Sequence, residues 1–101
     1  MLDREFFLGF IKIHILYHAS KELIFGVEIA EELGRHGYSI SPGTLYPVLH
    51  RLEKEGYLKS SPKVVNGRMR RYYQATAEGK LVLEQSKKKI RELVTEVIEE
   101  K

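Results

Sequence analysis

The segment "YSISPGTLYPVLHRLEKEGYL", residues 38–58, contains the start, the apolar face and the end of one helix. Ser41 suits the capping position, and Pro42 suits the first helical position because it lacks an N–H group. Gly56 is typical of the left-handed residue that follows a helix. The apolar residues share one helical face, namely Leu45, Val48, Leu49 and Leu52. The polar residues predicted to face away from the core are Thr44, Tyr46, His50, Arg51 and Lys54.

Two further helices are predicted before this segment. Residues 4–18 carry apolar side chains over more than one helical face, which predicts a helix buried on two sides. The stretch "HASKEL" is expected to be a loop, and a second helix is predicted over residues 25–36. The four residues "YSIS" then connect it to the next helix, and this is the connection length of a helix-turn-helix.

After residue 56 the apolar period changes from about 3.6 to 2. "YLKSSPKVV" and "RMRRYYQAT" are predicted strands, and Asn66–Gly67 between them is a strong signal for a hairpin turn. By alternation, Arg68 and Arg70 share one face of this hairpin and Arg71 lies on the other. Thr76 is expected to cap a last helix that runs to about residue 100.

The positive charge of the chain is concentrated in its middle third. The net charge of all 101 residues is only +3. Residues 35–72 contain eight Lys and Arg against two Glu, a net charge of +6, whereas the remaining residues have a net charge of −3. Such asymmetry indicates a polyanionic partner.

The order helix, helix, turn, helix, hairpin, long helix predicts a mainly α (α+β) fold, a winged helix-turn-helix with a long C-terminal dimerisation helix. Residues 1–76 would form the DNA-binding domain and residues 77–101 the dimerisation helix. The third helix of such a unit enters the major groove. Arg51, Arg68 and Arg70 are expected to hold phosphates, while Ser39, Thr44 and His50 would lie nearest the bases. The full set of predicted DNA-binding residues is Ser39, Ser41, Gly43, Thr44, Tyr46, His50, Arg51, Lys54, Lys63, Asn66, Gly67, Arg68 and Arg70.

Three linked motifs resemble the PadR family of bacterial and archaeal transcriptional regulators. They are "FGVEIAEEL", "ISPGTLYPVLHRLEKEGYL" and "GRMRRYYQATAEGK", and the resemblance covers roughly residues 8–85. It implies a homodimeric repressor that binds double-stranded DNA, with a C-terminal helix that pairs with the partner's N-terminal and C-terminal helices. The single C-terminal helix is similar to that of the short-tailed subgroup.

The predicted dimer interface combines the first helix with an apolar seven-residue repeat in the last helix. Its residues are Phe6, Phe7, Phe10, Leu83, Ile90, Leu93, Val94 and Val97. The resemblance also implies a small aromatic or hydrophobic effector that binds near this interface and releases the DNA. Phe6, Phe7, Phe10 and Tyr17 would line its pocket, and the alternative is that they form plain dimer core.

Other classes of function have weaker support in the sequence. The chain contains no cysteine, so disulfides and thiolate zinc sites are excluded. His14 and His18 are one helical turn apart but lack a third ligand in the sequence pattern, so no metal site is expected. No arrangement of acid, base and nucleophile indicates an enzyme, and no cofactor is expected.

Two alternatives for the partner remain open. A winged helix can instead dock an acidic protein, and the charged middle third fits that function as well. The chain could also be a ligand sensor with degenerate DNA contacts, although the basic hairpin argues against this alternative. The N-terminal stretch lacks the features of a signal peptide or a membrane span, so a cytoplasmic protein without membrane association is expected.

Overall fold

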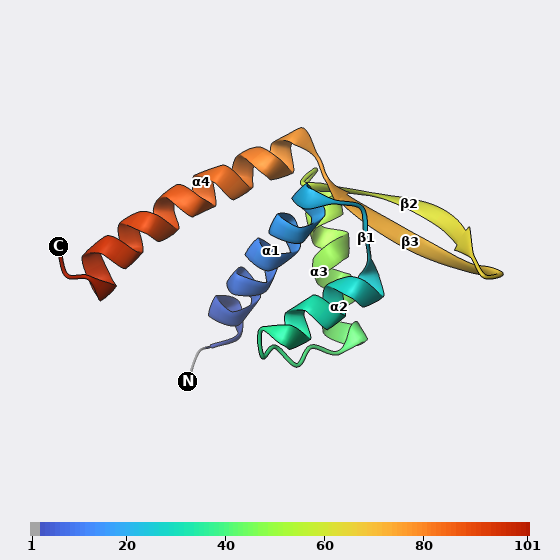
Figure 1. Cartoon of the computed structure of the whole chain (residues 1–101), viewed down its shortest axis with the longest axis horizontal. Coiled ribbons are helices and arrows are strands. Elements are labelled where there is room, and N and C mark those ends of the chain that lie inside the picture. The colour runs from blue at the N-terminus through green and yellow to red at the C-terminus, as the bar shows by residue number, and fades with distance from the viewer. Residues whose placement is uncertain (1–2) are drawn as a thin grey trace.

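The computed structural model describes residues 3–101 and has the predicted winged-helix order (Figure 1). Its elements are α1 (Arg4–Lys21), β1 (Ile24–Phe25), α2 (Gly26–Arg35), α3 (Pro42–Lys54), β2 (Leu58–Val65), β3 (Arg68–Ala75), α4 (Ala77–Leu93) and η1 (Val94–Ile98). The η1 turn is a π-helix that continues α4, so the last helix ends close to its predicted boundary. Among the described residues, no helix is both long enough and apolar enough to cross a membrane.

The first connection differs from the sequence prediction. Helix α1 begins after Asp3, whose side chain accepts a hydrogen bond from the Phe6 N–H at 2.9 Å, and it continues to Lys21 rather than ending at residue 18. The predicted loop "HASKEL" is therefore mostly helical. The two residues of β1 then pair with β3, Ile24 opposite Tyr73 and Phe25 opposite Tyr72. A strand of two residues is too short to show alternation, so the sequence pattern missed it.

Helix α3 has the predicted start, apolar face and end. Ser41 occupies the N-cap position, but its side chain makes no capping hydrogen bond to the backbone, in contrast to the prediction. Its hydroxyl oxygen lies 3.3 Å from the Thr44 hydroxyl oxygen instead. Gly56 has φ of 87° and ends the helix in the left-handed conformation, as predicted.

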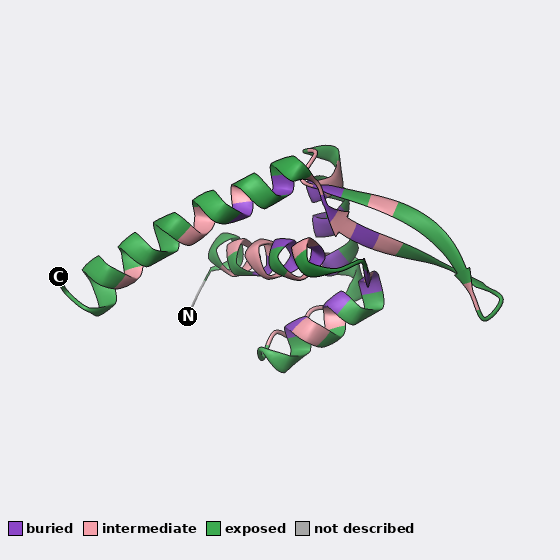
Figure 2. Ribbon diagram, turned by 45° about the horizontal axis from the view of Figure 1, so that its top comes forward, coloured by how far each residue is buried: buried purple, intermediate pink, exposed green. Residues whose placement is uncertain are grey.

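The three strands form one antiparallel sheet in the order β1-β3-β2. Asn66 and Gly67 both have positive φ, 52° and 76°, which is the two-residue turn that matches the twist of a hairpin. The base of the hairpin is buried at Tyr73 and Ala75, while its outer part is exposed on both faces (Figure 2). We refer to the β2–β3 hairpin as the wing.

The core lies between α1, α2, α3 and the base of the wing. Its largest fully buried side chains come from all of these elements and are Ile11, Ile15, Ile29, Leu33, Leu45, Leu49 and Leu58. Figure 2 shows buried residues on the facing sides of these helices, whereas the far half of α4 is exposed around most of its surface. The core therefore fixes α3 and the wing base relative to each other.

Helix α4 starts at a tightly packed corner. The Thr76 hydroxyl accepts a hydrogen bond from the Gly79 N–H at 3.0 Å and donates one to the Gly56 carbonyl at 2.6 Å. A Cβ on Gly79 would lie 2.1 Å from the Tyr57 carbonyl oxygen, so only glycine fits there. From this corner α4 extends away from the core (Figure 1), and the radius of gyration of 14.7 Å exceeds the about 13 Å of a compact chain of this length.

Candidate nucleic-acid interface

The outer side of α3 is a narrow strip of small, polar and basic residues. At about 3.6 residues per turn, the side opposite the apolar face carries Gly43, Pro47, His50 and Lys54. All four are exposed. Pro47 is inside the helix and has no N–H, so the usual hydrogen bond from this position to the carbonyl four residues earlier, that of Gly43, cannot form. The helix can therefore approach a partner closely along this strip.

Tyr46 lies beside the strip and rests against the start of α2. A Cβ on Gly26 would lie 3.1 Å from the Tyr46 hydroxyl oxygen, so the ring packs directly on this glycine. The side chain nevertheless remains 45% exposed. Tyr46 therefore supports α3 against α2 through its hydroxyl end, while much of the residue remains at the surface.

On the other side of the strip, Thr44 and Arg51 line a shallow hollow next to α1. Arg4 and Lys12 of α1 line the same hollow, which also contains Glu5. Thr44 is half-buried and Arg51 is exposed. Positive side chains of α1 therefore continue the basic surface of α3 beyond the predicted residues.

A hydrogen-bonded relay joins the wing to α3. The Ser60 hydroxyl donates to Glu53 Oε2 at 2.6 Å and accepts from Arg71 at 3.0 Å. Arg71 therefore lines a hollow together with Tyr46, His50 and Lys54 of α3. Burial and the nearby Glu53 carboxylate raise the pKa of Tyr73, which also lines this hollow.

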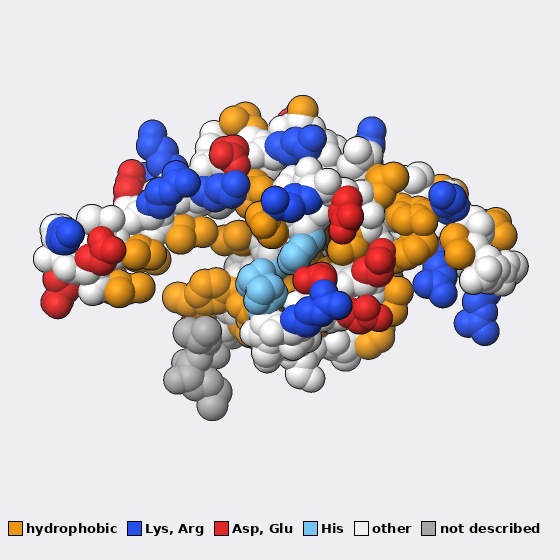
Figure 3. All heavy atoms as spheres, viewed as in Figure 1, with side chains coloured by type: hydrophobic (Ala, Val, Ile, Leu, Met, Phe, Trp, Pro, Cys, Tyr) orange, Lys and Arg blue, Asp and Glu red, His pale blue; other side chains and the backbone are white. Residues whose placement is uncertain are grey.

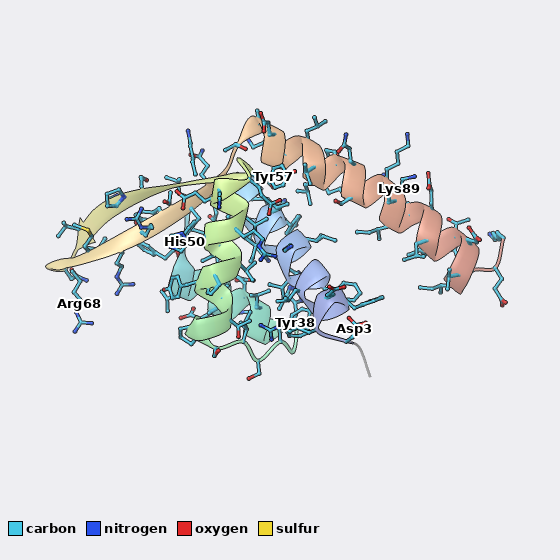
Figure 4. The ribbon with its side chains drawn as sticks, turned by 180° about the vertical axis from the view of Figure 1, so that it is seen from behind. Asp3, Tyr38, His50, Tyr57, Arg68 and Lys89 are labelled. Carbon is cyan, nitrogen blue, oxygen red and sulfur yellow. The ribbon has the colours of Figure 1, made fainter. Side chains whose placement is uncertain are left out.

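The other face of the wing carries cations above aromatic rings. The Arg70 guanidinium lies 5.2 Å from the centroid of the Phe25 ring, and the Lys63 ammonium lies 5.4 Å from that of Tyr72. The two rings stack with centroids 3.9 Å apart. Arg70 and Arg71 therefore lie on opposite faces, as alternation predicted, while Arg68 extends from the wing near its tip (Figure 4).

Every predicted DNA-binding residue except Thr44 is exposed, and all of them belong to α3, to the turn before it or to the wing. Besides Arg4 and Lys12 of α1, two residues that were left out of the predicted set border the same surface. Arg71 was left out because it lies on the opposite face of the wing from Arg68 and Arg70. The face that carries Arg71 is, however, the one turned toward α3. Pro47 was missed because a proline gave no signal for binding.

The predicted dimer-interface residues divide into those that are wholly or partly buried within the chain and those that are exposed. Leu83 is only 4% exposed and belongs to the chain's own core, and Phe7 packs against Tyr38 with ring centroids 5.3 Å apart. Val94 is half-buried. The remaining residues are large, apolar and exposed, and they are Phe6, Phe10, Ile90, Leu93 and Val97.

The sequence and fold were compared with known proteins. A model of the "Transcriptional regulator PadR-like family" matches residues 15–85. "Transcriptional regulator Rv3488" of Mycobacterium tuberculosis is 47% identical over 95 residues, which cover 94% of this chain and 89% of that protein. The crystal structure of a PadR-like transcriptional regulator from Bacillus cereus has a TM-score of 0.82 at 33% identity, and the match covers 90% of each chain.

A second solved structure contains nucleic acid. Bacillus subtilis PadR, crystallised in complex with operator DNA, has a TM-score of 0.65 at 28% identity, over 74% of this chain and 45% of that one. The match to solved PadR structures confirms the predicted winged-helix fold. The family consists of transcriptional regulators, which confirms the prediction that the chain is not an enzyme. The sequence and the fold together show that this chain belongs to the PadR-like family of transcriptional regulators.

Proposed function

We propose that this chain is a homodimeric repressor that binds a near-palindromic operator with α3 in the major groove. The observation that carries the proposal is the continuous exposed surface shared by α3 and the wing, on which basic side chains surround a strip of small and polar residues. DNA is a polyanion whose phosphates bind lysine and arginine, and its major groove admits a helix. A protein that binds chromosomal DNA in this way would act in the cytoplasm.

Within this surface the residues have different roles. The strip of α3 with His50 would face base edges, together with Ser39 and Thr44 at its N-terminal end. Arg51 flanks the strip and Lys54 lies at its C-terminal end, and Arg68, Arg70 and Lys63 extend the contact to phosphates along the wing. We add Arg71 to this set, because its guanidinium lines the same hollow as His50 and Lys54.

The exposed apolar faces of α1 and α4 support a dimer. Ile90, Leu93, Val97 and Ile98 are between 39% and 73% exposed along the far half of α4, and Phe6 is 53% exposed on α1. Apolar surface of this kind is normally covered in a stable protein. A second copy would cover α4 with its own α1 and α4, and the two copies of α3 would then read half-sites about 34 Å apart.

Release of the DNA by a small aromatic effector is the most specific part of the proposal. Phe6, Phe10 and Tyr17 follow one another at helical spacing on the exposed side of α1, and the Phe6 and Phe10 rings lie 5.2 Å apart. Tyr17 also borders a hollow between α1 and α4. An aromatic molecule that binds here would change how α4 of one copy packs on α1 of the other.

Fluorescence anisotropy tests the DNA-binding part of the proposal directly. The purified protein is titrated into a labelled duplex from its own upstream region and into a scrambled duplex, at several salt concentrations. We expect tighter binding to the upstream duplex, with a log–log salt slope of about −0.9 for each phosphate contacted. Absence of binding to either duplex at about 50 mM salt would contradict the proposal and favour an acidic protein partner.

A further inference from the structure

Three of the four histidines of the chain gather at one place outside the nucleic-acid surface. His14 and His18 lie one turn apart on α1, and His36 lies directly after α2. Each offers one ring nitrogen to the cluster, and these three nitrogens lie within 4.8 Å of one another. Figure 3 shows histidine side chains side by side at the surface of the molecule.

The geometry is close to that of a metal site. Ligands of a tetrahedral zinc ion with Zn–N bonds of about 2.0–2.1 Å have nitrogens about 3.3 Å apart. The His14 and His36 rings already stack with centroids 4.5 Å apart, and a rotation of the His36 side chain would have to bring its nitrogen to that spacing. His36 is exposed and follows the last turn of α2, which leaves its side chain free to make that rotation.

The cluster lacks the partners that buried imidazoles normally have. His18 Nε2 is buried and has no hydrogen-bond partner among residues 3–101, which is rare for a polar atom in a folded protein. Glu32 Oε2 lies 3.8 Å from this nitrogen, too far for a hydrogen bond, while the other carboxylate oxygen binds Arg35.

We propose that His14, His18 and His36 bind one divalent transition-metal ion of the zinc class, with Glu32 or water as the fourth ligand. Imidazole suits Zn²⁺, Ni²⁺ and Cu²⁺, while Ca²⁺ and Mg²⁺ require oxygen ligands. The ion would give His18 Nε2 the partner it lacks and would join α1 to the end of α2. Because His36 opens the turn that leads to Ser39 and Ser41, the ion would also hold the start of α3 in place.

Metal binding is measured on the full chain without a histidine tag and without DNA, so the result is independent of the proposed function. Isothermal titration with Zn²⁺ should give one ion per chain, and Co²⁺ should give the visible absorption of a tetrahedral site. His36→Gln should weaken Zn²⁺ binding by about 100-fold or more, since even outer partners of a ligand contribute about 10- to 100-fold. His18→Gln should have a similar effect.

The fourth histidine provides a matched control. His50 lies on α3 outside the cluster, so His50→Gln should leave the affinity for Zn²⁺ unchanged. Because His36 is exposed, His36→Gln should leave the chain folded, and circular dichroism verifies this. The proposal is overturned if the chain shows no saturable Zn²⁺ binding, or if folded His36→Gln binds Zn²⁺ as tightly as the unmodified chain.

Discussion

The wing and α4 both extend from one corner of the helical core, but they expose different chemistry (Figure 1). The outer half of the wing carries Lys63, Arg68, Arg70 and Arg71 around a polar turn. The outer half of α4 instead carries a row of exposed apolar side chains, Ile90, Leu93, Val97 and Ile98. A basic hairpin is stable in water and attracts a polyanion, whereas an apolar row requires a cover. The difference fits the proposal that DNA binds the wing and that a second copy of the chain covers α4.

Both elements depend on the same few residues at their common base. Thr76 joins the end of β3 to the start of α4, and its hydroxyl binds Gly56 at the end of α3. The Tyr57 carbonyl at the start of β2 accepts the Thr76 N–H at 3.1 Å and lies against Gly79. A change at this corner should therefore affect both elements, whereas a change farther out should affect only one.

The largest expected effect is that of Gly79→Ala, which would disturb the common base. The new Cβ would lie 2.1 Å from the Tyr57 carbonyl oxygen, and neither backbone segment can move without breaking the Thr76 contacts. We expect a loss of about 4 kcal/mol in the free energy of unfolding, above the usual range for overpacking. Urea denaturation measures it. Gly34→Ala is the matched control: open space surrounds Gly34 in α2, so we expect a gain of about 0.5 kcal/mol or more.

Leu93→Glu should disrupt the exposed apolar row of α4 without affecting the wing. Leu93 is 58% exposed within the chain, so the substitution should leave the monomer folded. In a symmetric dimer both copies would lose a buried leucine, so the free energy of dimer dissociation should fall by about 3 kcal/mol or more. Sedimentation equilibrium measures the shift to monomer. Lys88→Glu, on the opposite side of α4, should leave the dimer intact, and a dimeric Leu93→Glu variant would show that this row is not the interface.

Much of this architecture could be predicted from local signals in the sequence. The alternation around Asn66–Gly67 gave the wing, and the apolar spacing of Leu45, Val48, Leu49 and Leu52 gave α3. Strand β1 could not be predicted, because two residues carry no period and pair only when β3 lies beside them. The place of Leu83 could not be predicted either. It fits an apolar repeat, but only the packing of α4 decides that it lies in the chain's own core.

The nucleic-acid surface and the histidine cluster also differ in how far the sequence could predict them. The basic residues of α3 and the wing are close in sequence to clear motifs, so their shared surface could be predicted. The contribution of Arg71 depends on which face of the hairpin turns toward α3, and that is a tertiary property. His36 is 18 residues away from His18, and only the packing of α2 on α1 brings the two rings together.

Arg71→Ala tests whether the wing contacts DNA from the face near α3. We expect the Kd for every duplex to rise about tenfold, which is about 1.4 kcal/mol. The log–log salt slope should become less steep by about 1, as for the loss of one phosphate contact. Arg35→Ala removes the same charge from α2, where Arg35 pairs with Glu32, and should change the Kd about twofold at most. A change of preference at a single base pair would instead mean that Arg71 reads a base.

Ser60→Ala should have the smallest effect, because it removes the relay but keeps every charge. The Glu53 carboxylate loses a hydrogen bond of 2.6 Å and Arg71 loses its acceptor, so the free energy of unfolding should fall by about 1 kcal/mol. DNA affinity should fall less than for Arg71→Ala, since the guanidinium remains but is held less firmly. Ser61→Ala, on the opposite exposed face of β2, should change stability by less than about 0.5 kcal/mol. If Ser60→Ala matches that control in both measurements, the relay does not fix the wing, and Arg71 reaches its phosphate from a hairpin that only the core holds in place.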